Sequence, residues 1–202
     1  MVQRALHEGV DAHIIAADGG ARVANYFGRT PHTIIGDMDS LPAKELHRLT
    51  QLGAQVHRYP PEKDETDLEL CLQFAAEQGA DWIRVIGGIG GRFDQVLANV
   101  LLMTMPVLAD CDVEVVAGKQ AIRLLRTGEN TITGDMGDTV SLIPLAGDVT
   151  GITTQNLRYP LINETLRFGL ARGVSNEMSH TSATVTIEQG VLLLIHTVGK
   201  AE

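Results

Sequence analysis

The sequence predicts an α/β protein: an N-terminal mostly parallel sheet with flanking helices, followed by a smaller C-terminal antiparallel β-sandwich domain. Up to about residue 118, short apolar runs alternate with segments of helical spacing, which is typical of a parallel sheet covered by helices. From about residue 119 the helical spacing fades, and short strand-like runs stand between turn residues such as Gly147-Asp148. We therefore expect two directly packed domains, at 1–120 and 121–202.

In the first half, four strands alternate with three helices. Strands are predicted at 13–17 (HIIAA), 33–35 (TII), 55–59 and 82–86 (WIRVI), and helices at 43–52, 67–78 and 93–103. In the third helix the apolar side chains repeat on one face, as an amphipathic helix requires. In the second half, strands are predicted at 139–143, 183–187 and 191–196, where apolar residues alternate with polar ones or run without interruption.

The composition is that of an ordinary globular protein, with 44% hydrophobic and 20% charged residues. The formal net charge of −9 repels phosphate backbones, so no nucleic-acid partner is expected, although a metal ion could neutralise a small anionic substrate locally. No apolar run reaches the length of about twenty residues that crosses a bilayer, so no membrane partner is expected. Cys71 and Cys111 lie far apart in apolar surroundings, and the start lacks a signal peptide; both indicate a reduced, cytoplasmic protein.

Each strand predicted in the first half is followed by a loop of acids and glycines. The four loops are Asp18-Gly19-Gly20, Gly36-Asp37-Met38-Asp39-Ser40, Asp64-Glu65-Thr66-Asp67, and Gly87 to Asp94. In an open α/β sheet, ligands bind in the crevice beyond the carboxyl ends of the strands. If the four strands are parallel neighbours, these loops converge on one crevice, where their carboxylates repel one another unless a divalent cation is present.

Such a crevice suits magnesium and a phosphate-bearing substrate. Magnesium prefers oxygen ligands and commonly takes one or two carboxylates together with substrate phosphates. Glycines allow backbone N–H groups to approach phosphate oxygens closely, and Arg92 offers two donors to one phosphate. The pattern therefore indicates a phosphoryl-transfer site, in which positioning and charge neutralisation supply most of the catalysis.

Each part of this pattern also has an interpretation without a ligand. Asp18-Gly19 suits an ordinary turn after a strand. Thr66 followed by Glu69 forms a capping box, so Thr66 serves equally well as a helix cap. Met38 fits the core, which would turn the two flanking aspartates outward on the same side. The recurrence of the pattern at four successive strand ends favours a site over four separate turns.

Several familiar sites are absent from the sequence. It has no G-x-x-x-x-G-K-S/T loop, which excludes a standard P-loop enzyme, and its glycine cluster lacks the G-x-G-x-x-G spacing of a dinucleotide site. The seven histidines form no zinc-binding pattern. A G-x-S-x-G nucleophile elbow is also missing.

Taken in order, these segments resemble the thiamine pyrophosphokinase family, and the resemblance spans nearly the whole chain. In the first half the matching segments are Ala17 to Ala21, Pro31 with Ile35 to Ser40, Lys63 to Glu69, Gly87 to Arg92 with Asp94, and Asn99. In the second half they are Leu157 to Leu161, Leu166 to Gly169 and Val174 to Glu177.

The resemblance implies a thiamine diphosphokinase, an enzyme that transfers pyrophosphate from ATP to the hydroxyl of thiamine and gives thiamine diphosphate and AMP. It implies Mg²⁺ as cofactor and ATP as co-substrate. It further implies a catalytic domain at 1–120 that binds ATP and magnesium, and a β-sandwich domain at 121–202 for thiamine binding and dimerisation. The expected assembly is a homodimer with active sites at the subunit interface.

The resemblance also implies roles for individual residues. The catalytic set is Asp37, Asp39, Asp64 and Asp67, of which Asp37, Asp39 and Asp67 are expected to hold the metal. The residues expected to bind ATP are Asp18, Gly19, Gly36, Ser40, Lys63, Thr66, Arg92 and Asp94. Those expected to bind thiamine are Gln95, Tyr159, Ser175 and Asn176.

Three features depart from the family pattern. Members usually begin with a further strand and a glycine-containing loop, whereas this sequence opens almost directly in the first helix; either the start is truncated or the sheet lacks an edge strand. Gln95 stands where the family has histidine, so an acid–base role there is absent. Asn156 replaces a glycine before Leu157, and asparagine tolerates left-handed backbone angles.

Two other functions remain open from the sequence. One is a pyrophosphokinase for another small alcohol, such as a pterin, with the metal and ATP residues unchanged. The other is a non-catalytic nucleotide- or thiamine-binding protein, which the short start and Gln95 favour. The sequence retains all the clustered acids, which argues against the non-catalytic protein, since repulsion among clustered carboxylates that have no function destabilises a fold.

Overall fold

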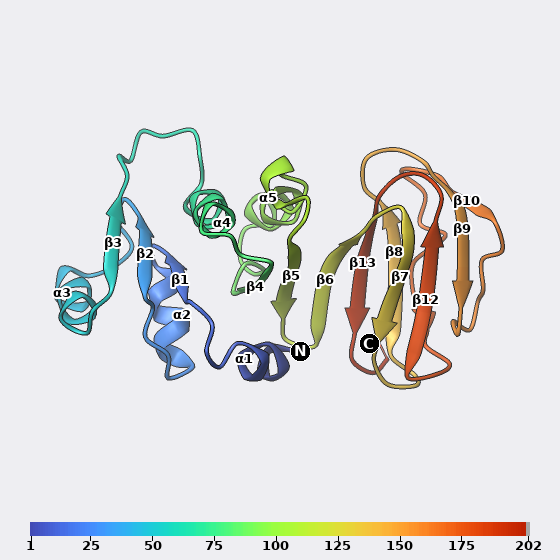
Figure 1. Cartoon of the computed structure of the whole chain (residues 1–202), viewed down its shortest axis with the longest axis horizontal. Coiled ribbons are helices and arrows are strands. Elements are labelled where there is room, and N and C mark those ends of the chain that lie inside the picture. The colour runs from blue at the N-terminus through green and yellow to red at the C-terminus, as the bar shows by residue number, and fades with distance from the viewer. Residues whose placement is uncertain (201–202) are drawn as a thin grey trace. The chain divides into compact units, whose positions relative to one another are not determined.

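The computed structural model describes residues 1–200, which form two compact units (Figure 1). The first unit comprises Gln3–Val113, and the second begins at Glu114 and also includes Met1 and Val2. The division falls within strand β5 (Asp112–Ala117). No helix of the described part of the chain is long and apolar enough to span a membrane.

The first unit alternates strands and helices, as predicted. Its elements are α1 (Val2–Glu8), β1 (Ile15–Ala17), α2 (Gly20–Tyr26), β2 (Thr33–Gly36), α3 (Ala43–Gln51), β3 (Gln55–Arg58), α4 (Asp67–Glu77), β4 (Trp82–Ile86), α5 (Phe93–Leu102) and the 3-10 turn η1 (Pro106–Leu108). Strands β1, β2 and β3 form a parallel sheet in that order. The prediction of a parallel sheet with helices is therefore confirmed.

The central strand of this sheet, β2, is covered on both faces. Ile34 lies in an apolar cluster with Ala21 of α2 and Leu49 of α3. Its neighbour Ile35 points to the opposite face and packs against Leu70 of α4. Burial on both faces explains why the sequence of β2 is apolar without alternation.

The fourth predicted strand does not join the parallel sheet, so the expectation of four parallel neighbours is wrong. Strand β4 lies at the end of a different sheet, next to β5. The N–H of Asp112, the first residue of β5, donates a hydrogen bond at 2.9 Å to the carbonyl oxygen of Asp81, which directly precedes β4. An apolar run identifies a strand but carries no information about its neighbours, so the sequence locates β4 without giving its pairing.

The second unit is built from antiparallel strands, as predicted. These strands are β6 (Gln120–Leu125), β7 (Gly128–Thr133), β8 (Thr139–Pro144), β9 (Val149–Gln155), β10 (Glu164–Leu166), β11 (Asn176–Glu177), β12 (Ser182–Ile187) and β13 (Leu192–Thr197). One sheet has the order β10-β9-β12-β7, and the other contains β11-β8-β13-β6-β5. Ile152 and Val185 from the first and Leu142 and Leu194 from the second share one buried core, which makes this unit a β-sandwich.

A buried carboxylate joins the start of β8 to the end of β13 in the second unit. Oδ2 of Asp138 lies 2.7 Å from Nε2 of His196, and the backbone N–H groups of Gly199 and Asp135 donate to the same carboxylate at 2.7 and 3.0 Å. Burial acts to raise the pKa of Asp138, but the hydrogen bonds from Gly199, Asp135 and His196 outweigh it. The pKa of Asp138 is therefore held below its usual value.

We expect Asp138 to make the stability of the second unit depend on pH in the acid range. A pKa lowered by folding stabilises the fold above the unfolded pKa of about 3.9, and this stability is lost as pH falls through the lower folded value. Asp138→Asn should lower the free energy of unfolding in urea by about 1–3 kcal/mol at neutral pH, and the deficit should shrink below about pH 4. The exposed Asp135→Asn is the control. A deficit of constant size across this pH range would contradict the prediction.

Candidate functional site

Three carboxylates meet at one edge of the parallel sheet. Asp18 follows β1, Asp37 follows β2, and Asp67 is the first residue of α4. One carboxylate oxygen from each residue can be chosen so that all three lie within 4.8 Å of one another. We call this group the three-carboxylate site. Its place beyond the carboxyl ends of parallel strands is where α/β sheets usually bind ligands.

Asp18 is held by the backbone of the neighbouring strand and loop. It is 4% exposed, its N–H donates to the carbonyl oxygen of Ile35 at 2.8 Å, and its Oδ2 accepts from the N–H of Ser40 at 3.0 Å. Its Oδ1 is buried and has no hydrogen-bond partner among the described residues. A buried acceptor in this state costs free energy unless a ligand satisfies it.

Asp67 is positioned by the N-terminus of α4. Oγ1 of Thr66 accepts a hydrogen bond from the N–H of Glu69 at 3.2 Å, which confirms the interpretation of Thr66 as the helix cap. Nζ of Lys63 lies 2.9 Å from Oδ1 of Asp67. The contact with Asp67 raises the pKa of Lys63, and the charges of Asp37 and Asp18 add to the rise. The ammonium group therefore stays charged and offsets part of the repulsion among the carboxylates.

Gly36 allows two of these carboxylates to come close together. A Cβ atom at this position would lie 2.9 Å from Cβ of Asp18 and 3.0 Å from both Cγ and Oδ1 of Asp67. Its φ of 149° also lies in the range that residues with side chains rarely adopt. The glycine that ends β2 is therefore a requirement of the site and not only of the turn.

The loop after β2 turns its aspartates away from the core, as expected if Met38 points inward. Met38 has a φ of 69° and is buried in the apolar cluster that Ile34 forms with α2 and α3. Asp37 is half-buried, Asp39 is exposed, and Oδ1 of Asp37 accepts from the N–H of Asp39 at 3.0 Å. Arg22 of α2 donates to the carbonyl oxygen of Ser40 and so ties this loop to the helix that precedes β2. No motif in the sequence pointed to Arg22.

Four residues predicted for the site lie outside the three-carboxylate site. Asp39 and Asp64 are exposed and do not belong to the group. Arg92 donates two hydrogen bonds to Asp94, at 3.1 and 2.6 Å, which raises the pKa of Arg92 and lowers that of Asp94. The two side chains are 73% and 64% exposed, so their pairing contributes little to stability. Both remain accessible to a ligand.

The three-carboxylate site fits a magnesium ion. All its donors are carboxylate oxygens, which are the ligands that Mg²⁺ prefers. The unpartnered Oδ1 of Asp18 is an acceptor that a cation would satisfy. Asp18, which the sequence assigned to ATP, is thus a candidate metal ligand that the sequence reasoning missed, although it directly follows a strand in the same way as Asp37.

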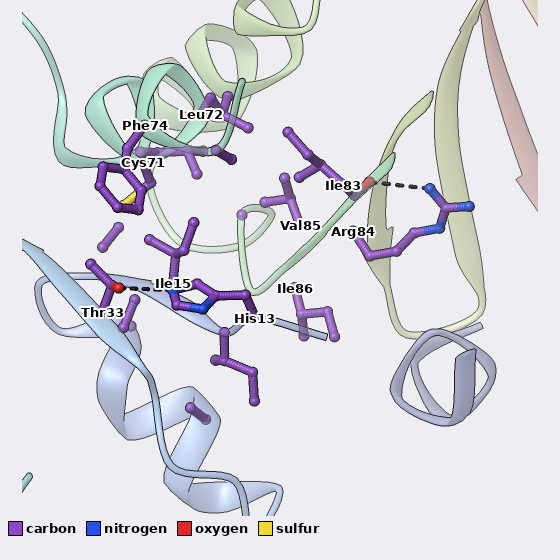
Figure 2. Close-up of a pocket in the computed structure, with 18 of the residues that line it drawn as sticks. His13, Ile15, Thr33, Cys71, Leu72, Phe74, Ile83, Arg84, Val85 and Ile86 are labelled. Atoms are coloured by element: carbon purple, nitrogen blue, oxygen red, sulfur yellow. Dashed lines mark hydrogen bonds between the residues drawn. The ribbon is translucent and has the colours of Figure 1, made fainter. Parts of the chain in front are cut away.

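A cavity of about 1390 Å³ opens beside this site in the first unit. Its polar lining includes Lys63, Thr66 and Asp67 as well as Gln95 and Asn99 of α5. Figure 2 shows its apolar lining, in which the labelled side chains include Ile15, Cys71, Leu72, Phe74, Ile83 and Val85. Burial raises the pKa of the Cys71 thiol to about 12, so it stays protonated and unreactive near neutral pH.

In the second unit, three residues predicted to bind thiamine lie together. Asn176 of β11 accepts from the N–H of Tyr159 at 3.0 Å and donates to its carbonyl oxygen at 2.8 Å. Ser175 directly precedes Asn176 and has a φ of 62°. Asn156 has a φ of 61°, which confirms that an asparagine here adopts left-handed backbone angles. The side chain of Asn176 thus fixes the segment that carries Tyr159.

Both units match a known family in sequence. The family described as "Thiamin pyrophosphokinase, catalytic domain" matches residues 8–116, and "Thiamin pyrophosphokinase, vitamin B1 binding domain" matches residues 128–192. The thiamine pyrophosphokinase of Bacillus subtilis (strain 168) is 31% identical over 182 residues, which cover 90% of this chain and 85% of the relative. Relatives from Oryza sativa, Arabidopsis thaliana and Caenorhabditis elegans are longer, and the chain covers 62% to 66% of their length.

The fold matches solved structures with the same name. The crystal structure of thiamine pyrophosphokinase from Bacillus subtilis has a TM-score of 0.83 at 29% identity, covering 91% of this chain and 86% of that one. The crystal structure of thiamin pyrophosphokinase from Geobacillus thermodenitrificans has a TM-score of 0.78 at 32% identity, covering 91% and 85%. The likeness therefore extends over both units.

Proposed function

The chain belongs to the thiamine pyrophosphokinase family, and from that premise we propose that Asp18, Asp37 and Asp67 form its catalytic centre. The activity is that of an ATP-dependent thiamine diphosphokinase, which transfers pyrophosphate from ATP to the hydroxyl of thiamine. One observation carries the proposal for the centre: three carboxylate oxygens lie within 4.8 Å of one another, next to a buried acceptor without a partner in the described chain.

Each residue of the centre has a distinct task in the proposed mechanism. Asp18, Asp37 and Asp67 would hold Mg²⁺, which when bound neutralises charge on the phosphates of ATP. Lys63, paired with Asp67, keeps its charge and would contact a phosphate oxygen. The hydroxyl oxygen of thiamine forms a bond to the β-phosphorus of ATP while the bond from that phosphorus to the oxygen shared with the α-phosphate breaks. AMP leaves with the shared oxygen, and the hydroxyl proton is released to water.

Further assignments rest on the family resemblance and are part of the proposal. Asp39 and Asp64 complete the catalytic set, with Asp39 as an additional metal ligand. ATP would be bound by Gly19, Gly36, Ser40, Lys63, Thr66, Arg92 and Asp94, and thiamine by Gln95, Tyr159, Ser175 and Asn176. The proposed domains are 1–120 for catalysis and 121–202 for thiamine binding and dimerisation, in a cytoplasmic homodimer.

Release of AMP tests the proposed reaction directly. The full chain incubated with ATP, Mg²⁺ and thiamine should give AMP and thiamine diphosphate in equal amounts, separated by chromatography, and neither without Mg²⁺. A pterin alcohol in place of thiamine tests the alternative acceptor. If AMP forms with the pterin alcohol but not with thiamine, the acceptor substrate is a pterin. If neither alcohol gives a product, the result favours a non-catalytic binding protein.

The proposed homodimer predicts that activity depends on assembly. If thiamine binds where two subunits meet, turnover per chain should fall when the protein is diluted below the dissociation constant of the dimer. Mass photometry at each dilution would report the fraction of dimer, and the AMP assay would report turnover. Constant turnover per chain in a sample shown to be monomeric would exclude a site shared between subunits.

A further inference from the structure

The loop that joins β4 to α5 (Figure 1) is anchored by a side chain of the helix that follows it. We call residues 87–91 the glycine loop, because all of them except Ile89 are glycine. Nδ2 of Asn99 donates a hydrogen bond to the carbonyl oxygen of Gly88 at 2.7 Å. None of the backbone–backbone hydrogen bonds outside the helices and strands of the described residues involves this loop. Asn99 therefore supplies a hydrogen bond that fixes the backbone of the loop.

Asparagine is an unusual residue at this position of α5. Asn99 lies in the second half of the helix, between the apolar residues Ala98 and Val100. Asparagine favours caps and turns over helix interiors, because its short side chain competes for backbone hydrogen bonds. Asn99 is half-buried, so its amide needs a partner, and the carbonyl oxygen of Gly88 is that partner. A residue that disfavours its own helix and binds the loop points to a role outside α5.

The hydrogen bond from Asn99 determines which way the next peptide group faces. Peptide bonds are planar, and the described chain contains no cis peptide bond, so the N–H of Ile89 points opposite to the C=O of Gly88. Because that carbonyl oxygen accepts from Asn99, the N–H of Ile89 points away from Asn99. A carbonyl oxygen repels an anion, whereas a backbone N–H attracts it. Asn99 thus keeps the repelling group on its own side and leaves the attracting group on the other.

The glycine loop also has room and positive charge beside it. A Cβ atom at Gly90 or Gly91 would meet no atom within 4 Å. Arg92, which follows the loop, is 73% exposed, and its pairing with Asp94 raises its pKa, so the guanidinium stays charged. Phosphate oxygens accept hydrogen bonds both from arginine and from backbone N–H groups in turns. The loop and Arg92 therefore suit one anionic ligand.

We propose that Asn99 is a positioning residue for ATP. By holding the carbonyl oxygen of Gly88, it orients the glycine loop so that the N–H of Ile89 donates to a phosphate oxygen. The proposal rests on the proposed function, since that function supplies ATP as the anion. Asn99 acts through the loop and touches no reacting atom. Its loss should therefore weaken the binding of ATP and leave the binding of thiamine unchanged.

Binding without turnover tests this role on the full chain. The probe is α,β-methylene-ATP with Mg²⁺, in which carbon replaces the oxygen of the bond that breaks, and calorimetry gives its dissociation constant. Asn99→Leu keeps nearly the shape of the side chain and removes its donor, so the dissociation constant should rise by about tenfold. Asn99→Ala also removes the donor and takes its place if Asn99→Leu does not fold. An unchanged dissociation constant in a folded variant would overturn the proposal.

A second probe identifies the part of ATP that the glycine loop holds. Inorganic tripolyphosphate with Mg²⁺ carries three phosphates and no nucleoside. Its dissociation constant should rise in Asn99→Leu by about the same factor as that of α,β-methylene-ATP. A rise for α,β-methylene-ATP without a rise for tripolyphosphate would place the loop at the nucleoside and overturn the proposal.

Steady-state kinetics separate the positioning of ATP from a general loss of structure. In Asn99→Leu the KM for ATP should rise by about tenfold, and the KM for thiamine should stay unchanged. Asn99→Gln keeps the amide on a side chain that is longer by one methylene group, so it should recover part of the lost affinity. Equal rises in both KM values, or equal losses in Asn99→Gln and Asn99→Leu, would contradict the proposal.

Asn130→Leu is the matched control. Asn130 of β7 is half-buried like Asn99, and its Nδ2 also donates to backbone carbonyl oxygens, those of Arg126 at 2.8 Å and Gly128 at 3.1 Å. This variant should lose stability in thermal unfolding and keep its affinity for α,β-methylene-ATP. Equal losses of affinity in Asn130→Leu and Asn99→Leu would reduce Asn99 to a structural role and overturn the proposal.

The parent chain distinguishes a failure of this proposal from a failure of the proposed function. If it binds α,β-methylene-ATP but forms no AMP with ATP and thiamine, the proposed function is wrong, and the calorimetry of Asn99→Leu still decides the role of Asn99. If it binds neither α,β-methylene-ATP nor tripolyphosphate, both proposals are overturned. If it forms AMP and Asn99→Leu binds both probes as the parent does, only the role of Asn99 is wrong.

Discussion

Asp67→Asn is expected to lower turnover by about a hundredfold or more while the fold stays intact. Asparagine has nearly the volume of aspartate, so the change removes one charge from the three-carboxylate site without opening a hole. The remaining carboxylates should hold Mg²⁺ more weakly, and Lys63 loses the partner that contributes most to its raised pKa. The loss at the helix N-terminus is small, about 0.3–1 kcal/mol, because Thr66 still caps α4. The AMP assay at several Mg²⁺ concentrations measures the effect.

Two further variants decide whether the loss belongs to the site. Asp37→Asn removes a second carboxylate of the same group and should lower turnover to a similar degree. Glu77→Gln removes one charge from the exposed end of the same helix and should leave turnover near that of the parent. Near-normal turnover in both aspartate variants, with folding confirmed by thermal unfolding, would show that the metal is held elsewhere.

The position of the site could be read from the sequence because parallel strands end at a common edge. Asp18 and Asp37 each follow an apolar strand directly, and Asp67 lies after β3 at the start of α4. Their convergence therefore needs β1, β2 and β3 to be parallel neighbours. The choice of metal ligands could not be read in this way. Asp37 and Asp39 are separated by a single residue, and the inward turn of Met38 leaves one half-buried and the other exposed.

Elements that depend on tertiary contacts were not predicted from the sequence. Helix α2 begins directly after Gly19, which offers no side-chain cap, so its start looked like a turn. Strand β6 reads QAIRLL, a composition that suits a helix, and its pairing with β5 and β13 overrides that preference. The pairing of β4 and the bond from Arg22 to Ser40 likewise join segments that are distant in sequence. The spacing of apolar and polar residues within one segment does not indicate which distant segment it contacts.

Gly36→Ala is expected to damage the site more than the fold. The added methyl group would meet Asp18 at 2.9 Å and Asp67 at 3.0 Å, so the carboxylates must separate or the end of β2 must shift. A displacement of about 1 Å is enough to lower turnover by about a hundredfold when groups must be placed accurately. The free energy of unfolding should fall by about 1–3 kcal/mol from the clash and the unfavourable φ. Urea unfolding and the AMP assay on the same preparation separate the two effects.

Gly28→Ala is the matched control for the backbone part of this change. Gly28 also has a positive φ, of 68°, but a Cβ there would meet nothing within 4 Å. It should therefore lose stability through backbone strain alone and keep its turnover, because it lies outside the three-carboxylate site. If Gly36→Ala retains turnover while losing as much stability as Gly28→Ala, the close approach of Asp18 and Asp67 is not needed for catalysis. Lost turnover at matched stability would instead show that the reaction depends on how tightly these two carboxylates are held together.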